Sequence, residues 1–231
     1  MENTQDILLE RFLRYVKTWT ESNTENADKG IQPSSPMQTD FAKELEKELK
    51  SIGITDIFVS EHAYVCARLP ATKGYENFPS VGFLAHMDTV DEVTGKNVNP
   101  QVFKNYDGSV LNIGNGILLD PAKDNDLKVS VGETIITTDG TTLLGADDKA
   151  GIAEIMNMAQ TLLQDSSIPH GKVCIAFTPD EEVGRGVENF DLEKFAADFA
   201  YTVDGGTLGG VNYETFNAAS AFVTVHGRSV H

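Results

Sequence analysis

The sequence predicts an α/β fold: a mostly parallel sheet with helices on both faces. Short, almost entirely apolar runs at residues 80–85 and 173–178 are typical of strands that are covered on both sides. Helical patterns alternate with these runs, which is the order expected for parallel strands joined by helices. With 231 residues, the chain is long enough to bury one sizeable core and to begin a second domain.

The N-terminal segment predicts two amphipathic helices separated by a loop. Apolar residues at helical spacing mark the first helix: Leu8, Leu9, Phe12, Val16 and Trp19. Residues 21–34 are rich in Asn, Ser, Gly and Pro, and we expect a loop there. Ser35 is then the expected N-cap of a second helix, with Pro36 at its first position and Gly53 at its end.

The following segments predict the sheet. Residues 54–60 and 63–69 are expected to be two strands of a hairpin or meander. The connection 90–131 is long enough to be functional or to contain short elements. Residues 134–144 are rich in β-formers and broken at Asp139-Gly140, which predicts a hairpin with Asp139 in its turn. The remaining predicted elements are strands at 80–85, 173–178 and 199–203 and a helix at 149–163.

Composition and charge exclude several classes of partner. A formal net charge of −17 argues against nucleic acid or an anionic membrane. The N-terminal residues MENTQD show no secretory signal, and no stretch approaches the roughly 18 apolar residues of a membrane span. Cys66 and Cys174 lie in apolar runs and are expected to be buried, reduced thiols, which predicts a cytoplasmic protein.

Acidic or imidazole side chains occur at four predicted strand ends. They are His86-Met87-Asp88, Asp147-Asp148, Asp180-Glu181-Glu182 and Asp204. Ligands bind at the carboxyl ends of strands in open α/β sheets. Like charges crowded there repel one another unless a cation lies among them. We therefore expect a metal-dependent hydrolase, with zinc, manganese or cobalt suited to these ligands and two metals sharing a carboxylate.

Two of these strand ends have alternative explanations that the sequence leaves open. Asp88 is suited to orient a metal-ligating His86, but the same pair also occurs by chance on surface loops. Asp147 and Asp148 open a helix, where aspartate is favoured as a cap. One of the two can cap the helix while the other faces a metal.

For the other two strand ends, the sequence likewise leaves open whether the acidic residues serve a metal site or an ordinary turn. Glu181 and Glu182 follow a buried strand and could lie in a solvated turn. Two adjacent carboxylates also supply the metal ligand and the general base that hydrolysis by water requires. Asp204 by itself is an ordinary turn aspartate, and its significance comes from its position after a further predicted strand.

Five blocks of sequence, spread over nearly the whole chain, are more specific than any single site. They are ERFLRYV at 10–16, GKNVNPQ at 95–101, LLGADDKAGIAEI at 143–155, FTPDEEVG at 177–184 and YTVDGG at 201–206. These blocks resemble the tripeptide aminopeptidases of the di-zinc metallopeptidase family. The resemblance implies a catalytic α/β domain interrupted by a smaller α+β lid or dimerisation domain. Residues 1–215 would be the N-terminal part of the catalytic domain, and residues 216–231 the truncated beginning of the lid domain.

The resemblance also assigns roles to the candidate site residues. The implied ligands of two zinc ions are His86, Asp147, Glu182 and Asp204, with Asp147 shared between the ions. Asp88 would orient His86, and Glu181 would be the general base. His231 matches a lid histidine that reaches substrate from the partner subunit of a dimer.

The function that the resemblance implies is hydrolysis of the N-terminal peptide bond of tripeptides by a zinc-activated water. The partner is then a short peptide, with a homodimer formed through the lid domain of the full-length protein. The family's last zinc ligand, a histidine, lies in the resumed catalytic part, so this chain alone is expected to be inactive. The alternatives are a dipeptidase or N-acyl amino acid deacylase of the same family, or a non-catalytic binding protein on the same scaffold.

Overall fold

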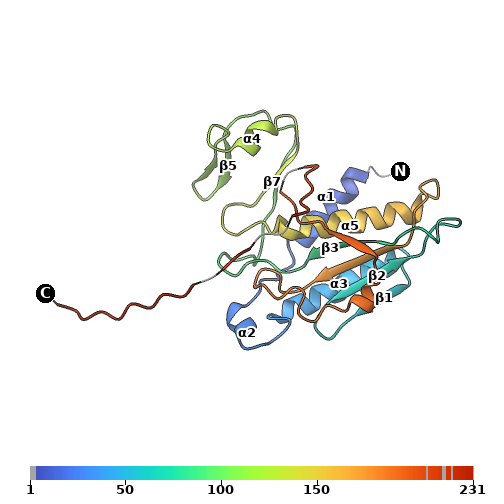
Figure 1. Ribbon diagram of the computed structural model, residues 1–231. Coiled ribbons are helices and arrows are strands. Elements are labelled where there is room, and N and C mark those ends of the chain that lie inside the picture. Colours follow the sequence, from blue (N-terminus) through green and yellow to red (C-terminus); the bar gives the residue numbers. More distant parts are fainter. Residues whose placement is uncertain (1–3, 207, 215–216, 220, 231) are drawn as a thin grey trace.

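A five-stranded sheet forms the centre of the computed structural model (Figure 1). The structure describes residues 4–206, 208–214, 217–219 and 221–230. The strand order is β1-β2-β8-β3-β9. The strands are β1 (Asp56–Val59), β2 (Val65–Leu69), β3 (Val81–His86), β8 (Val173–Thr178) and β9 (Phe199–Thr202). β3 pairs in parallel with β8 and β9, whereas β2 pairs antiparallel with β1 and β8.

The sheet is therefore mixed. The predicted hairpin at 54–60 and 63–69 is confirmed by the antiparallel β1–β2 pair, whereas the expectation of a mostly parallel sheet is wrong for the antiparallel pairing of β2 with β8. The short connection between β1 and β2 allows only an antiparallel hairpin, because a parallel pair requires a crossover of a dozen or more residues. β2 then lies between β1 and β8 and runs against both. At the other side of the sheet, β8, β3 and β9 run in the same direction, so their carboxyl ends meet at one edge.

The two faces of the sheet are covered unequally. The main core lies between one face and the helices α1 (Thr4–Tyr15), α3 (Pro36–Ser51) and α5 (Ala146–Gln164). Alternate residues of β8 face this core, while Cys174 and Ala176 face the other side. There, Phe195 of the short helix α6 (Leu192–Phe195) packs on them and on Cys66. Both cysteines are buried and free of disulfide bonds, as predicted.

The long connection after β3 contains a small lobe with its own core (Figure 1). Its elements are β4 (Gln101–Phe103), β5 (Leu111–Gly114), β6 (Ile117–Leu119), α4 (Asn125–Val129) and β7 (Ile135–Thr137). β7 pairs with β4, and residues 141–144 form no strand. The predicted hairpin at 134–144 is therefore wrong. Asp139 does close a turn, because its Oδ1 accepts hydrogen bonds from Thr141 N at 3.0 Å and Thr141 Oγ1 at 2.5 Å.

The N-terminal helices follow the prediction with three differences. α3 begins at Pro36 after an extended Ser35, as expected, although Ser35 makes no side-chain capping bond. α1 ends at Tyr15, short of Trp19. The predicted loop at 21–34 includes the short helix α2 (Thr24–Asp28), which Asn23 caps through its side chain.

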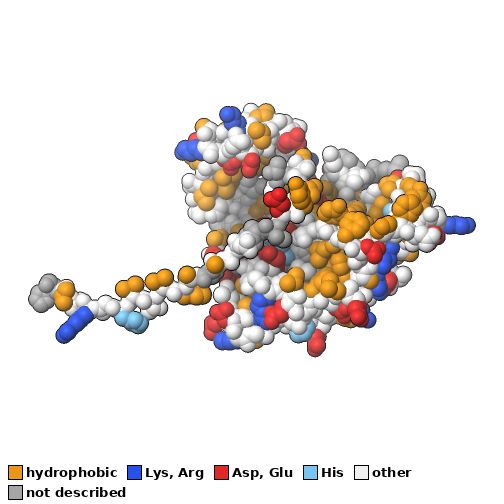
Figure 2. Space-filling view, in the orientation of Figure 1, with side chains coloured by type: hydrophobic (Ala, Val, Ile, Leu, Met, Phe, Trp, Pro, Cys, Tyr) orange, Lys and Arg blue, Asp and Glu red, His pale blue; other side chains and the backbone are white. Residues whose placement is uncertain are grey.

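The C-terminal segment extends away from the sheet (Figures 1 and 2). Among the described residues after Thr202, none lies in a helix or strand. Several large apolar side chains of this segment are exposed, namely Leu208, Phe222, Val223 and Val225. The predicted domain boundary after residue 215 stays a prediction. No helix in the described ranges has the length and apolar character needed to cross a bilayer.

Candidate metal centre

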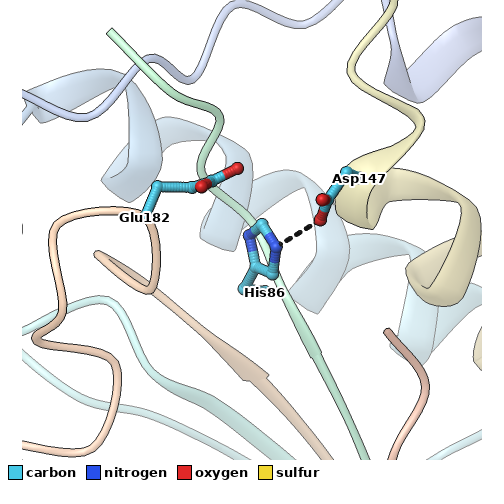
Figure 3. Close-up of side chains that lie close together, drawn as sticks. All are labelled: His86, Asp147 and Glu182. Atoms are coloured by element: carbon cyan, nitrogen blue, oxygen red, sulfur yellow. Dashed lines mark hydrogen bonds and ion pairs between the residues drawn. The ribbon is translucent and has the colours of Figure 1, made fainter. Parts of the chain in front are cut away.

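His86 lies at the centre of the candidate site, as the last residue of β3 (Figure 3). Its side chain is only 2% exposed. Nδ1 lies 3.0 Å from the backbone oxygen of Asp88 and 3.4 Å from Asp88 Oδ1. A hydrogen on Nδ1 satisfies these oxygens, so Nε2 is the nitrogen that a metal could bind once it displaces a proton from the imidazole.

Carboxylates from three other segments surround His86 Nε2. Asp147 Oδ1 lies 2.8 Å from it, and Glu181 Oε2 and Asp204 Oδ2 each lie 3.9 Å from it. These residues come from the start of α5, the turn after β8 and the segment after β9. The fold thus brings the four predicted strand ends to one place.

Two overlapping groups of side chains have the spacing of metal ligands. One group is His86, Asp147 and Glu182, and the other is His86, Asp148 and Asp204. Within each group, one potential ligand atom per residue lies within 4.8 Å of the others. Figure 3 shows the first group, with the imidazole between the two carboxylates. Of the predicted site residues, His231 lies outside the described part of the chain.

The start of α5 separates the roles of two adjacent aspartates. Neither Asp147 nor Asp148 has helical backbone angles. Asp148 Oδ1 accepts a hydrogen bond from Gly151 N at 3.2 Å, and its Oδ2 accepts one from His86 N at 3.1 Å. Asp148 therefore caps the helix and ties it to β3, while the 72% exposed side chain of Asp147 faces the imidazole.

Gly151 permits a close approach between α5 and the end of β9. A Cβ atom at this position would lie 2.0 Å from the backbone oxygen of Val203 and 2.4 Å from Asp148 Oδ1. Both distances are far below van der Waals contact. The missing side chain therefore lets the segment that carries Asp204 lie against the first turn of the helix.

Asp180 holds the turn after β8 and does not face the other carboxylates. It is fully buried and has a left-handed backbone conformation. Its carboxylate accepts hydrogen bonds from Ser34 N at 2.8 Å, Ser34 Oγ at 2.5 Å and Gln38 Nε2 at 2.6 Å. Of the three consecutive acids, only Glu181 and Glu182 remain available to the site.

Asp88 contacts more of the site than its predicted role as orienter of His86 requires. Its fully buried carboxylate accepts hydrogen bonds from the backbone N–H groups of Glu181 and Glu182, each at 3.0 Å. It also accepts one from Ser22 Oγ. The sequence did not point to Ser22, Ser34 or Gln38, because serine and glutamine in a polar segment carry no pattern that marks them as contacts of a distant residue.

The electrostatics of the cluster favour a bound cation. Burial lowers the pKa of His86, but the hydrogen bond and charge of Asp88 and the charge of Asp148 outweigh it and raise that pKa to about 10. Burial raises the pKa of Asp148 to about 8, and Asp204 adds to this effect. The cluster therefore holds protons at neutral pH that a metal could replace.

Burial also raises the pKa values of the two glutamates in the turn after β8. Burial, with the charges of Asp147 and Asp88, raises the pKa of Glu182 to about 7. The pKa of Glu181 is also raised, by burial first and then by Asp204 and other carboxylates, against the opposing effect of His86. Imidazole and carboxylate ligands with no thiolate fit zinc and similar divalent metals.

The fold and this cluster define an α/β protein with a candidate metal centre. No family model matches the chain. Over 226 residues, which are 97% of the chain, it is 54% identical to "Peptidase T" of Caldanaerobacter subterraneus subsp. tengcongensis. The chain is thus similar to a peptidase T over nearly all of its own length, and it spans about half (54%) of the length of that relative.

Solved structures give the same result. The chain is similar to an aminopeptidase PepT from Bacillus cereus, with 25% identity and a TM-score of 0.61 over 88% of this chain and 44% of that one. It is equally similar to a tripeptidase from Staphylococcus aureus, with 25% identity and a TM-score of 0.61 over 89% of this chain and 44% of that one. The α/β architecture of the described residues is therefore shared with these proteins.

Proposed function

We propose that this chain is the N-terminal part of a zinc aminopeptidase that releases the N-terminal residue of tripeptides. The observation that carries the proposal is the ring of carboxylates around His86 Nε2, in a chain 54% identical to a peptidase T. The names of the two similar solved structures, an aminopeptidase and a tripeptidase, support the substrate class.

The proposed zinc ligands are the four predicted ones. His86 and Asp204 would hold one ion, Glu182 the other, and Asp147 would bridge both, in keeping with its place 2.8 Å from the imidazole. When bound, the two zinc ions would supply Lewis acidity that lowers the pKa of a water molecule and polarises the scissile carbonyl. Asp148, which accepts the His86 N–H, would hold β3 and α5 at a fixed spacing.

Glu181 is the proposed general base. Its side chain is 51% exposed, so substrate and water can reach it, and its Oε2 lies 3.9 Å from His86 Nε2. Its raised pKa brings it closer to neutrality, where a carboxylate exchanges protons efficiently. Glu181 would accept the proton of the attacking water and pass it to the leaving amine. Asp88 would keep the hydrogen of His86 on Nδ1.

The remaining predictions are part of the same proposal. Residues 1–215 would belong to the catalytic domain and residues 216–231 to the start of a lid domain, with His231 contacting substrate. The proposal also includes a homodimer formed through the lid domain and a location in the cytoplasm. Each of these predictions concerns the full-length protein. The relative from Caldanaerobacter subterraneus is about twice as long as this chain.

A substrate panel and metal analysis of the purified full-length protein test the proposal. We expect near-stoichiometric zinc and cleavage of tripeptides with a free N-terminus, with little action on dipeptides or N-acetylated peptides. A preference for dipeptides or N-acetylated substrates would instead identify another amidohydrolase of the family. Protein that neither holds metal nor hydrolyses any member of the panel would contradict the enzyme reading altogether.

Zinc affinity should rise with pH between about pH 6 and 8. In the metal-free protein the pKa is about 7 for Glu182 and about 10 for His86, so both hold protons at pH 6 that zinc must displace. Each displaced proton increases affinity by up to about tenfold per pH unit. Competition with a chelator at pH 6, 7 and 8 measures this slope. An affinity that stays constant over the range would contradict the assignment of these two ligands.

A further inference from the structure

We propose that Ser22 is a positioning residue of this site: its hydroxyl fixes the Asp88 carboxylate and, through it, the turn that carries Glu181 and Glu182. The effect on activity rests on the proposed function. The effect on the turn does not, because it follows from hydrogen bonds that exist without metal or substrate.

Ser22 belongs to the segment of residues 18–22. This segment lies beside the residues that follow β3 and is hydrogen-bonded to them. Thr20 O accepts a hydrogen bond from Thr89 N at 3.2 Å, and Thr89 O accepts one from Ser22 N at 2.9 Å. At the other end of the segment, Thr18 O accepts a hydrogen bond from Lys149 Nζ at 2.6 Å. The backbone N–H of Ser22 and the residues before it are thus fixed before its side chain is considered.

The hydroxyl of Ser22 completes the hydrogen bonding of a buried carboxylate. Asp88 is fully buried, and Ser22 is 3% exposed. Asp88 Oδ1 accepts the Glu181 N–H, while Oδ2 accepts both the Glu182 N–H and the Ser22 hydroxyl. Among the described residues, Ser22 is the one whose side-chain hydroxyl donates to this carboxylate. A buried charge depends strongly on each such donor, because water cannot replace it.

Removing the hydroxyl should therefore loosen the turn. In Ser22→Ala, Oδ2 keeps only the Glu182 N–H, and the carboxylate can rotate about its Cβ–Cγ bond. Rotation misaligns the acceptors of the Glu181 and Glu182 N–H groups and moves Oδ1 relative to His86 Nδ1, from which it lies 3.4 Å. The proposed base and ligand would then no longer be held at a fixed distance from the imidazole.

The chain offers a closely matched control. Ser80 is 4% exposed, and its Oγ donates to Asp198 Oδ2 at 2.7 Å. It precedes β3, whereas Ser22 contacts the segment after β3. Ser80→Ala deletes a hydroxyl–carboxylate bond at the opposite end of the same strand, where the acceptor Asp198 is exposed, and so controls for the loss of a serine hydroxyl away from the turn. Ser22→Thr keeps the hydroxyl and serves as the conservative variant.

Hydrogen–deuterium exchange in the metal-free full-length protein tests the effect on the turn. We expect the Glu181 and Glu182 amides to exchange about tenfold faster in Ser22→Ala, because a hydrogen bond to a charged group is lost. The same amides should exchange at the wild-type rate in Ser80→Ala and close to it in Ser22→Thr. Unchanged exchange in Ser22→Ala, or equal acceleration in Ser80→Ala, would overturn the proposal. Should Ser22→Ala not fold, Ser22→Cys, with a weaker donor of similar size, must show faster exchange at these amides.

Steady-state kinetics test the consequence for catalysis. We expect kcat for a tripeptide to fall by about 10- to 100-fold in Ser22→Ala, with KM little changed and zinc still bound, as for other groups that orient metal ligands. Wild-type kcat in Ser22→Ala would overturn the catalytic part of the inference. Wild-type protein without peptidase activity would instead overturn the proposed function, while the exchange experiment still decides the role of Ser22.

Discussion

Replacing Glu181 by glutamine in the full-length protein should lower the turnover of tripeptides by about 10²- to 10⁴-fold, the usual contribution of a general base. Glutamine keeps the size of the side chain but cannot accept the proton of the attacking water. Zinc content should stay close to the wild-type value, because Glu182, not Glu181, belongs to the proposed ligand set. Steady-state kinetics and metal analysis of the same preparation measure both effects.

Two further substitutions make this result specific. Glu182→Gln should lower zinc content together with turnover, which separates a ligand from a base. Glu193→Gln, on the exposed face of α6, should change neither quantity. If Glu181→Gln retained turnover near the wild-type rate, Glu181 would have no place in the mechanism.

The second large effect is expected for His86→Ala, which should weaken zinc binding on the order of 10³-fold and abolish turnover with it. The reason is geometric: His86 belongs to both candidate ligand groups, so its loss removes a nitrogen ligand from each. Alanine also removes the positive charge that His86, with a pKa of about 10, holds among the carboxylates of the metal-free protein. Chelator competition and activity assays measure the two losses.

His170→Ala is the matched control for this prediction. His170 precedes β8, whereas His86 ends β3 at the opposite edge of the sheet, and its Nδ1 lies 2.8 Å from the backbone oxygen of Gly171. The variant should bind zinc and turn over substrate normally. Full zinc affinity in His86→Ala would show that the metal lies elsewhere.

Much of the fold was predictable because local sequence patterns determine it. The apolar residues of α3 and α5 recur at helical spacing. The nearly all-apolar runs became strands of the sheet, with β8 fully buried and β3 partly buried. The convergence of the acidic strand ends follows from the shared direction of β8, β3 and β9. That direction is itself the usual result of strands that alternate with helices.

The pairing of β2 with β8 and the partner of β7 were not predictable in the same way. β2 pairs with β8, more than a hundred residues later, and β7 pairs with β4 across the small lobe. Pairing of this kind depends on which edge is free in three dimensions, and it leaves no periodic signal in the sequence. The contacts of Asp88 with Ser22 and of Asp180 with Ser34 and Gln38 escaped prediction for the same reason.

Gly151 shows how a familiar route to a more stable enzyme would fail here. Alanine is the strongest helix former, and replacing glycine inside a helix commonly adds about 1 kcal/mol of stability. In α5 the new methyl group would collide with the Val203 carbonyl, directly before Asp204, and with the Asp148 carboxylate. Protein engineers who replace helical glycines one by one should therefore leave position 151 untouched, since thermal resistance and ligand spacing would be lost together.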